Sequence, residues 1–401
     1  MEAAAAGKFT GPFTQQEPIP DAAIAAAVAV LQSGRLHRYN LIGEEAGEVA
    51  QLEAEYRDWQ SSSYCLAVTS GGQALQIALR ACGVSAGEAV LTNGFTLAPV
   101  PGAIKAVGGE AILVEIDVNL RLDLDDLAAK IARSGARFLL LSHMRGHLCD
   151  MERLMQICDA AEVTVIEDCA HTMGARWDGK RSGNFGKVAC FSTQTYKHMN
   201  SGEGGLLTTD DPELVARATI LSGSYMLYAR HGAGPAEDAF DDARYDMPNC
   251  SARMDALRAA ILRPQLAGLE QNIIRWNARY NVVEKALRTQ RQIVTITLPA
   301  RENHVGSSIQ FRLPDFTAAQ CRALLAAALA RGVELKWFGA AQPLGFTSSH
   351  HSWCYTAPQN LPATDRILAT LFDMRLPLSF SEADCAQIGA LVCDAVREVA
   401  P

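Results

Sequence analysis

The sequence predicts an α/β protein with a mostly parallel sheet covered by helices, followed by a smaller C-terminal α+β domain. Between residues 64 and 166, short apolar runs that suit strands alternate with longer stretches of helical periodicity. This alternation is typical of parallel βαβ units. Beyond residue 249 it gives way to long amphipathic stretches and a few short apolar runs. The 401 residues are enough for two compact domains.

The N-terminal region is predicted to hold an arm and two helices. Residues 1–20 contain Gly and Pro but little apolar periodicity, so we expect an arm there. Asp21 is expected to cap an alanine-rich helix that runs to Ser33 and stops at Gly34. A second helix, rich in Glu and Ala, is expected over residues 43–59.

The alternating region supplies the predicted large sheet. Strands are expected at residues 65–68, 89–91, 111–115, 138–141 and 164–166, and helices at 73–82, 99–107, 124–134 and 151–160. In such sheets, active sites gather at the carboxyl ends of the strands. Polar residues that follow these strands are therefore candidates for a site.

The C-terminal part has a different pattern. Residues 253–288 predict one or two amphipathic helices, interrupted near Pro264. Further elements are expected at 293–298, 307–313, 321–331 and 366–372. We expect a large cofactor-binding domain over residues 21–270 and a small one over residues 271–401.

Composition excludes several classes of protein. The net charge is −8, from 36 Lys and Arg against 44 Asp and Glu, without the basic patch that a nucleic-acid binder needs. The eleven cysteines form no C-x-x-C pair, which argues against a zinc ribbon or a redox dithiol. We find no signal-peptide core and no apolar run of membrane-spanning length. These features favour a cytoplasmic protein without nucleic-acid or membrane partners.

Two motifs in fixed order carry the chemistry. The strand candidate at 164–166 leads into E-D-C-A-H at 167–171. Twenty-nine residues after Asp168 (197 − 168) stands Lys197, in F-S-T-Q-T-Y-K at 191–197, and G-E-G-G follows at 202–205. This set resembles the DegT/DnrJ/EryC1/StrS family of sugar aminotransferases, among the fold-type-I pyridoxal-phosphate enzymes. That family carries E-D-x-A-[QH], then F-S-x-x-x-x-K and G-E-G-G.

The resemblance covers residues 18–277, and more faintly the rest. It implies an aspartate-aminotransferase-like fold and pyridoxal 5'-phosphate, with pyridoxamine phosphate in the cycle. Lys197 would form the Schiff base and then act as the acid/base. Asp168 would keep the pyridine nitrogen protonated, and His171, in the [QH] slot, would lie over the cofactor. A surface lysine, a capping or ion-paired carboxylate and a structural histidine are the competing interpretations.

A phosphate cradle is expected where the 65–68 strand leads into a helix. There T-S-G-G-Q-A-L at 69–75 offers free N–H groups at a helix start, from Ser70, Gly71, Gly72 and Gln73. The family has S-G-T-x-A-L, so Gly72 replaces a threonine, and Gln73 or a water could supply the lost contact. Ser192 would reach the phosphate from the opposite side. A simple turn is the alternative.

Two further segments match the family with shifted spacing. N-G-F-T-L-A at 93–98 resembles T-[FWY]-x-A-[TS]. The aromatic slot falls on Thr96, but we expect Phe95 to stack on the pyridine face, with a core position as the alternative. D-M-P-N-C-S-A-R-M at 246–254 resembles G-x-N-x-R-[ML]. The slot falls on Ser251, two places after Asn249. The family's asparagine reaches the phosphate of the neighbouring subunit, so the resemblance implies a homodimer with shared sites; a helix cap is the alternative.

One more loop matches the family and could suggest a metal. H-M-R-G at 143–146 resembles V-H-L-[YF]-G after a strand. His143 and His147 are four residues apart, but no third ligand or H-E-x-x-H context accompanies them, so we predict no metal site.

The predicted function is ping-pong transfer of an amino group from an amino acid, L-glutamate or L-glutamine, to a keto-sugar nucleotide or keto-cyclitol. Small non-sugar ketones, aldehydes or amines are an alternative, favoured by the apolar segment G-S-Y-M-L-Y at 223–228. A dehydratase of the same family would carry histidine in place of Lys197, whereas His198 stands one position later. A non-catalytic regulatory protein is disfavoured by the Asp168–Lys197 pair.

Overall fold

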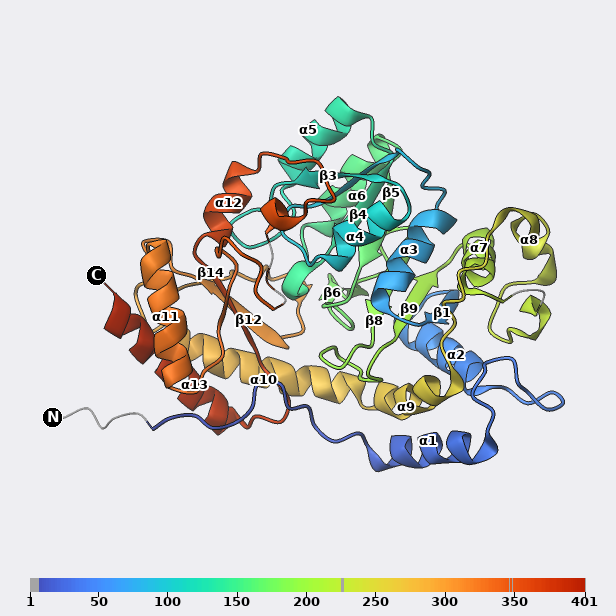
Figure 1. Ribbon diagram of the computed structural model, residues 1–401, viewed down its shortest axis with the longest axis horizontal. Coiled ribbons are helices and arrows are strands. Elements are labelled where there is room, and N and C mark those ends of the chain that lie inside the picture. The colour runs from blue at the N-terminus through green and yellow to red at the C-terminus, as the bar shows by residue number, and fades with distance from the viewer. Residues whose placement is uncertain (1–6, 225–226, 346, 348, 401) are drawn as a thin grey trace.

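The computed structural model describes residues 7–224, 227–345, 347 and 349–400. Its centre is a seven-stranded sheet in the order β1-β9-β8-β5-β4-β2-β3 (Figure 1). Only β9 runs antiparallel to its neighbours. The strands are β1 (Tyr64–Val68), β2 (Ala89–Asn93), β3 (Glu110–Val114), β4 (Phe138–Ser142), β5 (Thr164–Asp168), β8 (Val188–Ser192) and β9 (Gly205–Thr209).

Helices cover both faces of this sheet, because each parallel crossover places a helix on one face. One face carries α3 (Gly71–Ala81), α4 (Pro99–Ala106) and α7 (Pro212–Ser222), which bury Leu75, Ile104 and Leu214. The other carries α2 (Glu48–Gln60), α5 (Leu124–Ser134), α6 (Met151–Ala160) and α9 (Ala256–Ala267), which bury Leu52, Leu127, Leu154 and Leu262. The five predicted strands and four predicted helices of this region all form, with ends within two residues of those expected.

Three local predictions need correction. The first helix, α1 (Asp21–Ser33), has Pro20 at its N-cap, so Asp21 lies in the first turn and favours the helix through its charge instead of capping it. The second helix begins at Glu48, with Gly47 in an extended conformation at its N-cap, and Gly43, where φ is +60°, lies outside the helix. Pro264 lies inside α9, and the break falls at Gly268, before α10 (Leu269–Leu287).

A second sheet is built from C-terminal residues and is antiparallel, in the order β10-β12-β14-β13. It packs against α10 and two further helices (Figure 1). The predicted element at 366–372 is in fact the end of one helix and the start of a strand. The elements are β10 (Val294–Thr295), β12 (Ser308–Arg312), α11 (Ala318–Ala330), β13 (Lys336–Trp337), α12 (Pro362–Leu368), β14 (Leu371–Arg375) and α13 (Glu382–Val399).

The helix α10 joins the two hydrophobic cores. Trp276, near its middle, packs in the core beneath the large sheet, whereas Val283, further along, packs in the core of the C-terminal sheet. The expected arm is fastened to the second core: Phe9 and Phe13 meet Phe380 edge to face, with ring centroids 5.1 and 4.9 Å from it. The division of the chain at residue 270 stays a prediction.

The remaining elements are short. A three-stranded sheet joins β6 (Arg176–Trp177), β7 (Lys180–Arg181) and β11 (Glu302–Asn303), and α8 (Ala243–Asp246) follows α7. No helix in the described part of the chain is long and apolar enough to cross a membrane.

The sheet topology brings the motif residues together. Because β1, β4, β5 and β8 run parallel, their carboxyl ends share one edge. Ser70 follows β1 at this edge, and β4, β5 and β8 end there at Ser142, Asp168 and Ser192.

Candidate active site

Asp168 is held by hydrogen bonds at the ends of neighbouring strands. Its Oδ2 accepts from the Ser142 hydroxyl at 3.0 Å, and its Oδ1 accepts from the Ala170 N–H at 3.1 Å. Ser142 is itself fixed, because its Oγ accepts from Thr96 Oγ1 at 2.8 Å and its N–H donates to Asn93 Oδ1 at 2.9 Å. The carboxylate therefore has one orientation before any ligand arrives.

Asp168 is a buried carboxylate that a positively charged group would stabilise. The side chain is buried, and burial raises the pKa of its carboxyl, while the Ala170 N–H and the charge of Lys197 act in the opposite direction. A buried carboxylate is costly unless a positive group pairs with it. A protonated pyridine nitrogen would be such a group.

Lys197 contacts His171 directly. Its Nζ lies 2.8 Å from His171 Nε2, and the other ring nitrogen, Nδ1, accepts the Arg145 N–H at 3.3 Å. Burial lowers the pKa of His171 well below its usual value, and the charges of Lys197 and Arg145 lower it further, so the ring is neutral. A neutral ring that accepts at Nδ1 carries its hydrogen on Nε2. That hydrogen points at Lys197, which can accept it only as a free amine.

The electrostatics of Lys197 agree with this assignment. Burial lowers its pKa to about 7, even though Asp168 opposes the shift, and Arg145, Arg375 and Lys336 lower it further. About half of the side chains are therefore uncharged at neutral pH. A free amine is the form of lysine that attacks an aldehyde.

The segment predicted as a phosphate cradle begins helix α3 at the edge of the cavity. Ser70 caps α3 and accepts the Gln73 N–H at 3.1 Å. Gly71 packs so closely on Ser192 that an added Cβ would lie 2.8 Å from the Ser192 Cβ. Gly72 has room, since its Cβ would meet only Ser70 Oγ, at 3.8 Å. Ser70, Gly71, Gly72 and Ser192 all line the same cavity.

Phe95 does not form the predicted ring shelf. It is 1% exposed and meets Phe338 edge to face at 4.9 Å, in a core cluster with Ile116 and Met144. The neighbouring Thr96 and Leu97 line the cavity instead. The aromatic residue lies one position earlier than in the family motif, and at that position its ring packs in the core.

Gln73 and Asn249 lie away from the cavity of their own chain. Neither is among the residues that line the two cavities around Lys197. The Gln73 N–H donates to Ser70 Oγ, and the role of the Gln73 side chain in place of the contact missing at Gly72 stays a prediction. Asn249 is exposed, and its Oδ1 accepts from the Ser251 N–H at 2.9 Å. Its predicted role in a neighbouring subunit stays a prediction.

Glu167 and the two histidines near Arg145 have structural partners. Glu167 is fully buried and accepts from His143 Nε2 at 2.9 Å and from three N–H groups of residues 183–186. His147 donates from Nε2 to Gln310 Oε1 at 2.8 Å. Burial lowers the pKa of His147 to about 3, and the charge of Arg121 adds to this. The two histidines thus point to different partners.

A cavity of about 570 Å³ opens above Lys197, between the two sheets. It continues into a smaller, mainly apolar space lined by Thr96, Ser142 and Asp168. Sequence reasoning missed several of its residues. Ser142 could have been found, because it ends a predicted strand directly before the matched loop. Arg145 lies inside that loop, whereas Arg375, on β14, belongs to no motif.

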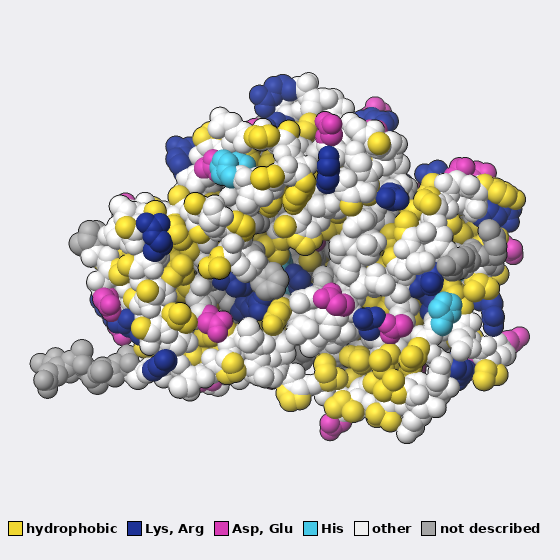
Figure 2. Space-filling model, viewed as in Figure 1, with side chains coloured by type: hydrophobic (Ala, Val, Ile, Leu, Met, Phe, Trp, Pro, Cys, Tyr) yellow, Lys and Arg dark blue, Asp and Glu magenta, His cyan; other side chains and the backbone are white. Residues whose placement is uncertain are grey.

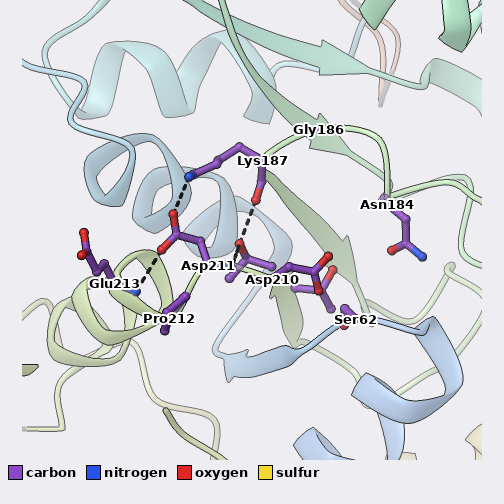
Figure 3. A pocket seen from close by; sticks show the side chains of 11 residues that line it. Ser62, Asn184, Gly186, Lys187, Asp210, Asp211, Pro212 and Glu213 are labelled. Carbon is purple, nitrogen blue, oxygen red and sulfur yellow. Dashed lines mark hydrogen bonds and ion pairs between the residues drawn. The ribbon is translucent and has the colours of Figure 1, made fainter. Parts of the chain in front are cut away.

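A second cavity of similar size, about 590 Å³, lies far from this chemistry. Figure 3 shows Lys187 and Asp211 paired at its wall, with Ser62 and Asn184 on the other side. Lys187 precedes β8 and Asp211 follows β9, so this cavity marks the edge where the parallel strands begin. Active sites of such sheets lie at the opposite edge.

Two observations bear on the alternative functions. His198 is not among the residues that line the two cavities around Lys197; its Nε2 lies 3.1 Å from Ser307 Oγ, and its ring packs on Trp276. Tyr228 stacks on Phe240, at a centroid distance of 4.6 Å. It is thus kept from the cavity, while residues 225 and 226 of the same apolar segment lie outside the described residues.

Comparison with known proteins shows the family to which the chain belongs. The family model of the DegT/DnrJ/EryC1/StrS aminotransferases matches residues 19–393. The chain belongs to this family. It is 30% identical over 282 residues to 3-amino-5-hydroxybenzoate synthase of Amycolatopsis mediterranei, covering 69% of this chain and 70% of that protein. It is 31% identical over 255 residues to L-glutamine:2-deoxy-scyllo-inosose aminotransferase of Streptomyces kanamyceticus, covering 63% and 58%.

Solved structures of related proteins have the same fold. A crystal structure of 3-amino-5-hydroxybenzoic acid synthase superposes with a TM-score of 0.81 at 26% identity, covering 96% of this chain and 99% of that one. The predictions of the DegT/DnrJ/EryC1/StrS family, of fold type I and of a pyridoxal-phosphate-dependent aminotransferase are thereby confirmed.

Proposed function

We propose that this DegT/DnrJ/EryC1/StrS aminotransferase moves an amino group from L-glutamine or L-glutamate to a keto-sugar nucleotide or keto-cyclitol by a ping-pong mechanism. The observation that carries the proposal is the 2.8 Å contact of Lys197 Nζ with His171 Nε2, in one cavity with the Asp168 carboxylate. The relative that is named for glutamine and an inosose supports both the donor and the cyclitol acceptor.

The residues present fit pyridoxal 5'-phosphate. The buried Asp168 carboxylate would pair with the ring nitrogen, and Gly71 and Ser192, which pack closely and line the same cavity, would hold the phosphate. Leu97 and His171 line the space between these ends. When bound, the cofactor supplies the electron sink that stabilises negative charge next to the transferred nitrogen.

The chain's own residues would handle binding and protons. Lys197 would hold the cofactor through its amine and would carry a proton to and from the substrate carbon. His171 would orient Lys197 through Nε2, since the Arg145 N–H fixes its tautomer. Asp168 would remain ionised and oriented by Ser142. Walls contributed by both sheets would limit the access of water.

The geometry of the site disfavours the alternative functions. A dehydratase needs histidine in place of the lysine, but His198 contacts Ser307, and Lys197 is the residue that lines the cavity with Asp168. The apolar segment that favoured small non-sugar acceptors keeps Tyr228 outside the cavity. Acceptors other than sugars nevertheless stay open, because one relative is named for an aminohydroxybenzoate. We also infer a cytoplasmic homodimer that acts on small molecules.

A donor and acceptor panel tests the proposal. We expect L-glutamine or L-glutamate to abolish the visible absorption of the bound cofactor, and a keto-cyclitol or keto-sugar nucleotide to restore it with an aminated product detected by mass spectrometry. Lys197→Ala should lose the visible band, and Asp168→Asn should keep some cofactor but lose most turnover. Lys105→Ala, at an exposed lysine of α4, is the matched control. An unchanged spectrum in Lys197→Ala would contradict the assignment.

A further inference from the structure

His350, His351 and Asp365 bring three metal-ligating atoms together at the surface of the C-terminal part of the chain. The Nε2 atoms of His350 and His351 each lie 2.9 Å from the same atom, Asp365 Oδ1. The two imidazole rings lie side by side, with centroids 4.0 Å apart. Asp365 stands 14 residues after His351, so no short sequence motif indicates this contact. Figure 2 shows histidine and acidic side chains next to each other on the surface near α12.

Two separate elements hold the three side chains. The histidines belong to a short turn over His350–Ser352, whereas Asp365 lies in the first turn of α12. Glu115, which follows β3, accepts two N–H groups at the start of α12, at 2.7 and 3.1 Å, and so fixes this helix to the large sheet. The side chain of His350 is 1% exposed and is therefore held by its surroundings. The carboxylate and one imidazole are thus oriented before any ligand binds.

The geometry suits a small divalent transition metal. Zn²⁺ binds imidazole nitrogen and carboxylate oxygen at about 2.0–2.2 Å, so the ligand atoms of a tetrahedral site lie about 3.3 Å apart. The three ligand atoms lie within 4.8 Å of one another, and each nitrogen–oxygen distance of 2.9 Å needs to lengthen by only about 0.4 Å. Two imidazole nitrogens also favour Zn²⁺ over Mg²⁺ or Ca²⁺, which prefer oxygen ligands.

The cluster is open to solvent on one side. The side chains of His351 and Asp365 are 62% and 36% exposed, so an ion can enter and water can complete its coordination. The other group of potential ligands among the described residues, His143, Glu167 and Cys169, is fully buried. Glu167 already accepts four hydrogen bonds there. Of the two groups, the one at His351 is the one accessible to an ion.

Hydrogen bonding alone is the competing interpretation. Both imidazoles can donate an N–H to Asp365 Oδ1. Such a bond from the exposed His351 to a half-exposed carboxylate adds little stability, and holding that side chain in one orientation costs conformational entropy. A shared metal ion gives a stronger reason for two adjacent side chains to converge on one oxygen.

The cluster lies next to residues that line the main cavity. Thr347, three residues before His350, is part of the cavity wall. Tyr355, four residues after His351, donates its hydroxyl to the oxygen of Ala98 at 3.2 Å, and Ala98 lines the same cavity. The turn that holds the two histidines therefore stands between two contacts with the cavity. An ion bound at this turn would fasten it to α12.

We propose that His350, His351 and Asp365 form a Zn²⁺ site, completed by water, and that the bound ion fixes the neighbouring wall of the main cavity. None of the three residues lines either cavity around Lys197. The ion would therefore act on the position of the wall and take no part in the reaction. The inference goes beyond the proposed amino transfer and does not depend on it.

The first test is calorimetric titration of Zn²⁺ into the full-length protein, in a buffer without phosphate or chelators. We expect one site whose affinity falls at least about tenfold in His351→Ala and in Asp365→Asn. The asparagine keeps an oxygen that accepts hydrogen bonds but loses the charge that binds a metal. His37→Ala, at an exposed histidine outside the cluster, is the matched control and should change nothing. Excess Mg²⁺ should not compete.

The second test measures amide hydrogen exchange in the peptide that covers residues 349–356. At about 100 times the Kd, Zn²⁺ suppresses any opening that releases the ion about 100-fold. Exchange should therefore slow at least about tenfold in the wild-type protein and in His37→Ala, but not in His351→Ala.

The outcomes separate the two parts of the proposal. No binding to the wild-type protein at about 100 μM Zn²⁺ would overturn the site, whatever happens to the folding of a variant. Binding that is equally tight in His351→Ala and Asp365→Asn would also overturn it, because the ion would then be bound elsewhere. Binding that depends on both residues but leaves exchange in residues 349–356 unchanged would overturn the effect on the cavity wall.

Discussion

The free amine of Lys197 gives the most direct prediction about the chemistry. With a pKa of about 7, half of the side chains are uncharged at pH 7. A lysine with the ordinary value of 10.5 would be uncharged in about 1 in 3,000 molecules at that pH. The reactive fraction of Lys197 is therefore raised about a thousandfold by its surroundings.

Pulse labelling of the cofactor-free protein with acetic anhydride measures this fraction, because only free amines are acylated. Peptide mass spectrometry gives the extent of labelling at Lys197 and, in the same sample, at the exposed reference Lys105. We expect labelling of Lys197 to rise between pH 6 and pH 8 and then level off, since the amine is protonated below its pKa and free above it.

Two substitutions should move this midpoint in opposite directions. Asp168→Asn removes a negative charge that raises the pKa of Lys197, so the midpoint should fall. Arg145→Met removes a positive charge that lowers the pKa, so the midpoint should rise. Labelling of wild-type Lys197 that still climbs steeply above pH 9 would refute the reasoning, because it would show an ordinary, solvated lysine.

Two further predictions concern the phosphate cradle and the subunit contact. Gly71→Ala should destabilise the protein by about 1–3 kcal/mol in urea unfolding, because its Cβ would collide with Ser192, whereas Gly72→Ala should not; equal losses would contradict the packing. If Asn249 completes the site of a partner, mixing Lys197→Ala subunits with Asn249→Ala subunits should restore about a quarter of wild-type turnover, from one intact site in each mixed dimer. Turnover that stays at the level of the separate variants would place Asn249 in its own subunit's site or in none.

The sequence predicted the parts of the fold and site that depend on long-range order in the chain. Lys197, Asp168 and Ser192 follow from motifs at fixed spacing after apolar runs, because parallel strands bring their carboxyl ends to one edge. Features that depend on small local differences in free energy are harder to predict from the sequence. Whether Pro20 or Asp21 occupies the cap of α1 changes little in the helix pattern, and Pro264 removes one helical hydrogen bond without ending α9.

The predictions about the site that were wrong or incomplete have a different cause. Phe95 and Thr96 are adjacent, and a shift of one residue decides which side chain turns into the core and which faces the cavity. Arg375 and Asp373 approach Arg145 only after the C-terminal sheet packs against the large one. No local pattern near residue 375 indicates that contact. Glu167 is buried because the loop at 183–186 folds over it, and no local pattern near residue 167 indicates that contact.

The placement of the main cavity between two sheets has a consequence for how such an enzyme diverges. The groups that handle protons and cofactor, Lys197, Asp168 and His171, belong to or follow strands of the large sheet. Ser308, on β12, and Arg375, on β14, line the same cavity from the C-terminal sheet. Substitutions on β12 and β14 can therefore change which molecules are accepted while the reaction itself is preserved. A new specificity can arise on one half of the molecule without rebuilding the catalytic half.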